Sequence, residues 1–288
     1  MPEGVLKKIF LILQAATIAV FLGRAWQHLR WDAPYWALFW DENWMRPLVE
    51  ELWGEPWAVY VSESGRTILS LIRTVGWFYL LCALAAAFIR RLKKIAVAIL
   101  FAGGISLFFL ALLYCKEKFF HLGQFLEYTL QWGSPFLLIW LFIKQNISLR
   151  FIFGIKIAIA FTFICHGLYA VGYYPRPGEF TEMTLILLQI GDQAAMRFLQ
   201  TVGWLDFLAS ILIFLPFSQI RMLGLLYCML WGFATTIARV WAHFQIDFWQ
   251  NSLSQWLHES LYRFPHFLIP GALLLYYFYA ASNRQNLR

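Results

Sequence analysis

The sequence predicts an all-helical protein that crosses a membrane several times. Of its 288 residues, 61% are hydrophobic and only 14% are charged, against roughly 25% charged residues in a soluble domain. Only helices and closed barrels satisfy the backbone inside a bilayer, and the long apolar runs here lack the alternating pattern of barrel strands. No basic soluble region accompanies the net charge of +7, so we expect a lipid bilayer as the partner and no nucleic acid.

Eight apolar windows are long enough to be membrane helices. A helix needs about 20 mainly apolar residues to cross about 30 Å of hydrocarbon. The windows are 5–27, 67–89, 95–114, 119–143, 151–173, 194–216, 219–242 and 256–281. We therefore expect eight transmembrane helices.

A repeated tetrapeptide divides these windows into two sets of four. Thr-Val-Gly-Trp occurs at 74–77 and again at 201–204, and each copy lies in a long apolar segment. The repeat predicts two four-helix units, residues 1–146 and 147–288. An even number of helices in each unit gives both units the same orientation, unlike the inverted repeats of many transporters.

The charged residues predict the orientation of the chain. One set of connecting segments carries Lys7, Lys8, Arg90, Arg91, Lys93, Lys94, Lys144, Arg150, Lys156, Arg221, Arg284 and Arg288, with Glu3 as their only acid. Under the positive-inside rule these segments face the cytoplasm. We therefore expect a multi-pass protein of the cell membrane, of the bacterial inner-membrane type, with both termini cytoplasmic.

The longest predicted loop, residues 28–66, is rich in tryptophan, which prefers the headgroup zone of a membrane. Within it Trp36, Trp40, Trp44, Leu48 and Leu52 recur every four positions. This spacing predicts an amphipathic helix lying flat on the outer surface, as a lid or collar over the first four-helix unit.

The second unit contains a pattern that resembles the DoxX/DoxD-like family of four-helix membrane proteins. Residues 166–172 read His-Gly-Leu-Tyr-Ala-Val-Gly, and after a turn-rich excursion residues 203–206 read Gly-Trp-Leu-Asp. In the first unit the pattern is weaker, with His28-Leu29 and Gly76 but Tyr79 in place of the acid. The resemblance implies tandem repeats and an association with membrane redox systems such as quinone-linked thiosulfate oxidation. It implies no catalytic mechanism, because the family is functionally diverse.

Ionisable residues inside the predicted helices are the site candidates, since an unpaired charge in lipid costs several kcal/mol. The main candidates are His166, Asp206, Arg239, His243 and Glu259, and the secondary candidates are His28, His121, Glu127, His258 and His266. Most of them fall in the outer half of the predicted membrane region. We expect a polar cavity that opens on that side.

Helical spacing brings part of this set together. Arg239 and His243 are four residues apart and share a helix face, and Glu259 lies one turn into the following antiparallel helix. An ion pair between Arg239 and Glu259 is within reach, with Asp206 as a second partner for the arginine. One interpretation is a structural pair that locks the second unit. The other is a pocket for a polar headgroup with His166 or His243 as proton donor.

Histidines facing one another across four-helix units also suggest haem. His28 with His121, and His166 with His258 or His266, are the pairs that the predicted topology offers. The tandem haem A synthases have a similar outline, but no histidine here is followed by the arginine of their pattern. The four cysteines form no Cys-x-x-Cys pair, so no metal site is predicted.

Two kinds of function remain open. The first is a non-catalytic accessory subunit that docks to other membrane-protein subunits of a redox or other complex. The second is a quinone-reactive or haem-bearing membrane oxidoreductase whose site is the cluster in the second unit. A small-molecule transporter fits less well, because parallel repeats without broken helices offer no obvious alternating-access device.

Overall fold

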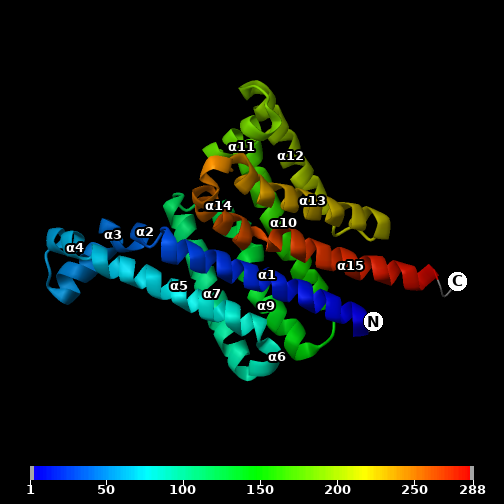
Figure 1. Ribbon diagram of the computed structural model, residues 1–288, viewed down its shortest axis with the longest axis horizontal. Helices are drawn as coiled ribbons and strands as arrows, with labels where there is room; N and C mark the ends of the chain where they lie inside the picture. The colour runs from blue at the N-terminus through cyan, green and yellow to red at the C-terminus, as the bar shows by residue number, and fades with distance from the viewer. Residues whose placement is uncertain (1–2, 286–288) are drawn as a thin grey trace.

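A computed structural model describes residues 3–285, and every regular element in that range is helical (Figure 1). In the first half these are α1 (Glu3–Arg30), α2 (Trp36–Phe39), α3 (Glu42–Pro47), the π-helix η1 (Leu48–Trp53), α4 (Trp57–Glu63), α5 (Gly65–Ala87), α6 (Ile89–Leu92), α7 (Lys94–Glu117), α8 (Leu122–Glu127) and α9 (Thr129–Lys144). In the second half they are α10 (Leu149–Val171), α11 (Gly178–Leu188), α12 (Asp192–Leu212), α13 (Ser218–Ala242), the 3₁₀-helix η2 (Ile246–Phe248), α14 (Trp249–Arg263) and α15 (Pro265–Gln285).

Six helical segments in the described part of the chain are long and apolar enough to cross a membrane. They are α1, α5, α7, α10, α13 and the segment Ile246–Ser282, which covers α14 and most of α15. The predicted all-helical class is therefore confirmed, and the number of such segments indicates a multi-pass membrane protein.

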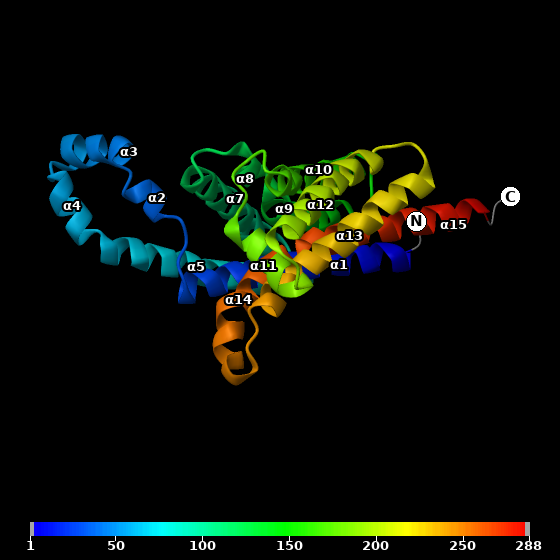
Figure 2. The same cartoon turned by 90° about the horizontal axis from the view of Figure 1, so that it is seen from above.

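The fourth and eighth predicted helices are each interrupted, which corrects the expectation of continuous helices there. The fourth window, 119–143, holds α8 and α9, which are separated at Tyr128. In the eighth window, α14 ends at Arg263 and α15 begins at Pro265. Proline suits the first position of a helix because the N–H that it lacks has no partner there. The break lets α14 project from the body of the molecule (Figure 2).

The tryptophan-rich loop is a chain of short helices and not the single amphipathic helix that its spacing predicts. The Asp41 carboxylate accepts a hydrogen bond from the Trp44 backbone N–H and so starts α3. Gly54, with φ at 70°, ends η1, and an extended Pro56 precedes α4. We call residues 36–63 the aromatic collar; it lies at one end of the molecule, beyond α1 and α5 (Figure 2).

Glycines set the closest helix contacts. A Cβ on Gly76 of α5 would lie 2.9 Å from the Leu29 side chain of α1, and one on Gly203 of α12 would lie 3.0 Å from the Gly167 carbonyl oxygen of α10. The glycine of each repeated tetrapeptide thus lets two apolar helices pack closely, α5 on α1 and α12 on α10. Gly23 does the same between α1 and α14, where a Cβ would lie 2.6 Å from the Tyr262 backbone nitrogen.

Candidate functional site

Three helices of the second half meet at a histidine–aspartate pair whose carboxylate is buried. His166 of α10 donates from Nδ1 to Oδ2 of Asp206 on α12 across 2.7 Å, and the Asp206 side chain is fully buried. Tyr227 of α13 donates its hydroxyl to the other carboxylate oxygen across 3.0 Å. Both Asp206 oxygens are therefore occupied. The hydrogen bond through Nδ1 leaves Nε2 as the remaining polar atom of the His166 ring.

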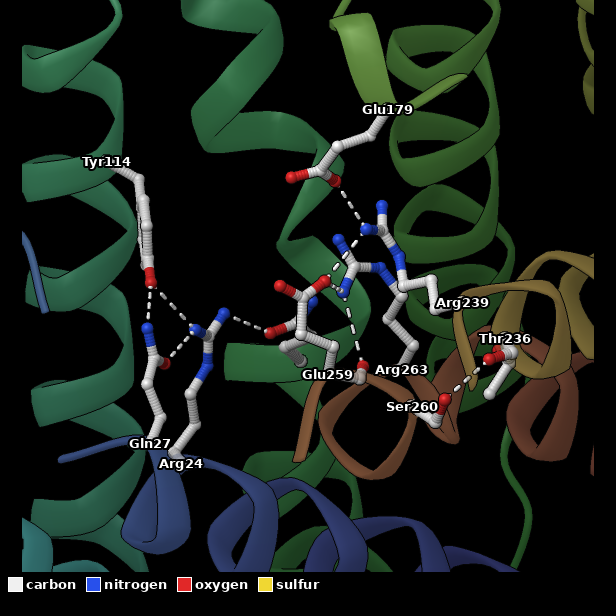
Figure 3. Close-up of polar contacts among 10 residues, drawn as sticks. Arg24, Gln27, Tyr114, Glu179, Thr236, Arg239, Glu259, Ser260 and Arg263 are labelled. Atoms are coloured by element: carbon white, nitrogen blue, oxygen red, sulfur yellow. Dashed lines mark hydrogen bonds and ion pairs between the residues drawn. The ribbon is translucent and has the colours of Figure 1, made fainter. Parts of the chain in front are cut away.

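A second polar cluster joins α11, α13 and α14. Arg239 Nη1 lies 2.8 Å from Glu259 Oε2 and 2.6 Å from Glu179 Oε2. Arg263, one turn after Glu259, contacts the same Glu259 oxygen across 3.2 Å. Figure 3 shows Arg239 held between the two glutamates. Arg239 thus pairs with Glu259, as the helical spacing allows, whereas Asp206 pairs with His166 instead.

The two clusters border one cavity of about 210 Å³. Its polar lining consists of Glu127, His166, Thr184, Thr235, Arg239, Arg263 and His266. Its remaining walls are apolar and come from α11, α12 and α13, with Phe180, Met183, Leu187, Leu188, Phe198, Leu199, Trp231, Ala234 and Ala238. A cavity with apolar walls and a few convergent polar groups is the usual form of a small-molecule site.

Glu127 enters this cavity from the first half of the chain. It ends α8, which packs on α10, and its side chain lines the cavity beside His166. Within residues 3–285 no hydrogen bond or ion pair engages its carboxylate. A void of about 20 Å³ adjoins it, lined also by His166, His266 and Thr235. That volume is large enough for one water molecule, and the polar groups around it are of the kind that such a water requires.

This arrangement can bind a neutral polar group and exchange a proton with it. With its Nδ1 proton donated to the Asp206 carboxylate, the His166 ring presents Nε2 as an acceptor when neutral and as a donor when protonated. Glu127 offers a second titratable group beside the same space. The two arginines are already engaged by Glu259 and Glu179, so the site lacks the free cations of an anion pocket.

The structure divides the predicted candidates into those at the cavity and those away from it. His166, Asp206, Arg239 and Glu259 form the two clusters, and Glu127 and His266 line the cavity. His243 does not join them. It caps the end of α13 and stacks on Trp256, with ring centroids 3.8 Å apart.

The remaining histidines are packed against aromatic rings. The His28 ring meets Tyr79 and Tyr35 edge-on, at centroid distances of 5.1 Å and 5.7 Å. His121 stacks on Tyr174, and His258 stacks on Trp31. His28 and His121 thus have different aromatic neighbours.

Sequence reasoning missed a buried arginine in the first half. Arg24 of α1 is only 2% exposed, and its guanidinium donates to Gln27 Oε1 at 2.7 Å and to Gln131 Oε1 at 2.6 Å. It lies 3.8 Å from the centre of the Tyr262 ring of α14, so it links the two halves. Figure 3 shows it with Gln27 and Tyr114 next to the Glu259 cluster. The sequence does indicate a buried polar site here, because Arg24 is a cation inside the predicted membrane helix 5–27.

Other members of the site had weaker signals. Arg263 follows Glu259 by one helical turn, but Glu179 lies in a turn-rich excursion and Tyr227 is one of thirteen tyrosines. Over the described range no three His, Cys, Asp or Glu residues are placed to hold a metal ion. Comparison of the chain with protein-family models, with curated proteins and with solved structures gave no match.

Proposed function

We propose that this protein binds a lipid-soluble molecule of the quinone type and acts within a membrane redox system. One observation carries the proposal: an apolar cavity among α10, α11, α12, α13 and α15 ends at a histidine that a buried aspartate orients. A quinone has this character, because its ring is apolar and its two carbonyl oxygens accept hydrogen bonds and protons.

His166 would hold one carbonyl oxygen of such a ligand by donating from Nε2 when its ring is protonated, and the neutral ring would accept the hydroxyl proton of the reduced ligand. The Asp206 carboxylate would fix the orientation of the ring through Nδ1 and stabilise its protonated form. Phe180 and Trp231 would flank the ring, and Glu127 would serve as a second proton-exchanging group. The cavity of about 210 Å³ suits a headgroup, whereas whole drug-sized ligands occupy about 300–1,000 Å³, so an isoprenoid tail would extend into the lipid.

Haem fits the same residues less well. His166 and His266 both line the cavity, and a histidine held by a carboxylate can ligate iron. The cavity of about 210 Å³ is nevertheless smaller than the about 300–1,000 Å³ that drug-sized ligands occupy, and a haem macrocycle does not fit in it. We therefore place the redox proposal on a quinone and not on haem.

The test is a spectrum combined with a binding titration on the full chain in detergent. Oxidised and dithionite-reduced absorption spectra and organic extraction of the same sample would reveal a haem band or a co-purifying quinone. Titration with a short-chain ubiquinone, followed by tryptophan fluorescence, should show saturable quenching because Trp231 lines the cavity.

Matched histidine variants make this test specific. His166→Gln should weaken quinone binding about ten-fold or more, the loss of one hydrogen bond of about 1.5 kcal/mol. His243→Gln should leave binding unchanged, because His243 stacks on Trp256 outside the cavity. Equal effects of the two substitutions, or no saturable quenching, would refute a quinone site at His166.

A second candidate is an accessory membrane subunit without a ligand of its own. The aromatic collar favours it, because Trp40, Trp44, Leu48, Leu52 and Trp53 are all exposed and aromatic anchors are typical of protein interfaces. Cross-linking in native membranes, followed by identification of partners of the wild-type chain and of a Trp44→Ser/Trp53→Ser variant, tests this role. Unchanged cross-links in the variant would show that the collar does not bind the partner subunits.

For the topology we propose eight spans in two DoxX-like four-helix repeats, with both termini in the cytoplasm. Helices occur in all eight predicted windows, and the corresponding pairs pack together in each half: α1 with α5 and α10 with α12, α7 with α9 and α13 with α15. Reporter fusions after residues 146 and 245 test the proposal. A cytoplasmic reporter should be active only at 146, and an external reporter only at 245.

A further inference from the structure

A groove at the opposite end of the second half from the candidate site contains cations without acidic partners. It has a volume of about 630 Å³ and lies among the starts of α10 and α13 and the end of α15. Leu149, Phe153, Lys156, Arg221, Tyr276 and Tyr277 are among its lining residues. By the positive-inside pattern this end faces the cytoplasm.

Lys156 is the least expected of these residues. It is only 8% exposed, and no described residue forms an ion pair or hydrogen bond with its ammonium group. The nitrogen instead lies over the rings of Tyr277 and Phe214, at 5.4 Å and 5.6 Å from their centres. A buried ammonium in a membrane needs a counter-charge, because burying it alone is costly.

Arg221 adds a second cation to the same groove. Its guanidinium donates to the Leu215 carbonyl and lies 4.5 Å from the centre of the Tyr277 ring, and no carboxylate in the described part of the chain pairs with it. The groove therefore holds two positive charges and no negative one. No acidic side chain among residues 3–285 supplies the counter-charge, which points to an anion bound from outside.

The first half has a groove at the corresponding position. It lies among the starts of α1 and α7 and the end of α9, and it contains Lys7, Arg90, Lys93 and Lys94 with Glu3 as the one acid. The same helices of each predicted repeat, the first, third and fourth, form both grooves. Two independent sets of side chains thus each produce an excess of positive charge at the same end of the molecule.

We propose that the groove at Lys156 binds an anionic phospholipid, with Lys156 and Arg221 contacting its phosphodiester headgroup. The surroundings suit a lipid and not a free anion, because Leu149 and Phe153 are 83% and 58% exposed beside the cations and provide an apolar path for an acyl chain. Basic pockets between membrane helices on the cytoplasmic side recognise anionic lipids in this way.

Lipid binding is measured on the full chain by native mass spectrometry during titration with phosphatidylglycerol or with zwitterionic phosphatidylethanolamine. Wild-type protein should bind phosphatidylglycerol in preference. Lys156→Met should weaken one binding step about five-fold, the effect of one cation near an anionic surface. Lys156→Arg should restore it, and Lys144→Met should have no effect because Lys144 does not line the groove.

Three results would overturn the proposal. The first is equal binding of the two lipids by wild-type protein, and the second is equal affinity of Lys156→Met and wild type. The third is displacement of phosphatidylglycerol by millimolar inorganic phosphate, which would assign the groove to a soluble phosphate compound. A photoreactive acyl chain gives an independent readout, since cross-links should map to 149–156 and 276–281 and a map elsewhere would refute the site.

Discussion

Removal of the Glu259 charge is the most informative perturbation of the polar cluster. The Glu259 carboxylate is the common partner of two arginines whose side chains are only 7% and 11% exposed. Glu259→Gln keeps the size of the side chain and removes its charge. Arg239 then retains only Glu179, whose side chain is 48% exposed, and Arg263 retains no acidic partner among the described residues.

The expected magnitude follows from this difference in burial. Breaking a buried ion pair by removing one partner costs about 3–5 kcal/mol. The lower end applies here, because the glutamine oxygen still accepts a hydrogen bond and Glu179 still pairs with Arg239. Glu179→Gln is the matched control, and it should cost no more than about 1 kcal/mol because its carboxylate is half exposed.

Thermal unfolding in detergent, followed by tryptophan fluorescence, measures both variants. With about 2–4 °C for each kcal/mol, Glu259→Gln should lower the midpoint by about 6–12 °C and Glu179→Gln by at most about 4 °C. The double variant Arg239→Gln/Glu259→Gln should cost less than the sum of the single changes, because it removes both charges together. Equal shifts for the two glutamate variants would show that Glu259 does not neutralise the buried arginines.

Three further predictions concern helix packing, the buried arginine and the collar. Gly232→Ala should destabilise the protein by about 1–3 kcal/mol and weaken quinone binding, because the added Cβ would lie 2.5 Å from the His266 carbonyl oxygen of α15. An unchanged melting midpoint would contradict this close contact. Arg24→Met should lower the free energy of unfolding by about 2–3 kcal/mol, because hydrogen bonds to a buried charged group are lost. Denaturant titration measures this change, and an unchanged free energy would show that the guanidinium has no structural role. The hydrogen bond from Lys116 lowers the pKa of Asp41, so the pair's contribution to collar stability should be complete above the ordinary aspartate pKa of about 4 and be lost as pH falls below it. Collar tryptophan fluorescence between pH 7 and pH 3 should show this loss, and a Lys116→Met variant with the same pH profile would argue against it.

Several features of the fold were predictable because they depend on local composition. Apolar runs of about 20 residues favour membrane helices wherever they occur, and six helical segments in the described part of the chain are long and apolar enough to cross a membrane. The interruptions were harder to foresee. Asp41 and Gly54 divide the collar into short helices, and each can be read as a helix cap only after the neighbouring backbone is known.

The candidate site was predictable only in part. Arg239 and Glu259 are linked by helical spacing and a short connection, so their pairing could be expected. His166 and Asp206 are 40 residues apart and lie on different helices. Membrane helices of similar apolar composition carry no sequence signal for which faces meet, so this pair depended on the packing of α10 on α12.

Composition and charge pattern are enough to predict the class of protein, the approximate helices and the asymmetric distribution of charge, because hydrophobicity and charge act segment by segment. Which buried polar groups are neighbours depends on how the helices pack. This packing brought Glu127 of the first half into the cavity beside His166, placed Arg24 against the Tyr262 ring and excluded His243 from the cluster. The physical reason is that these contacts depend on the rotation and register of packed helices, and glycines such as Gly23 and Gly203 fix both at single points along the chain.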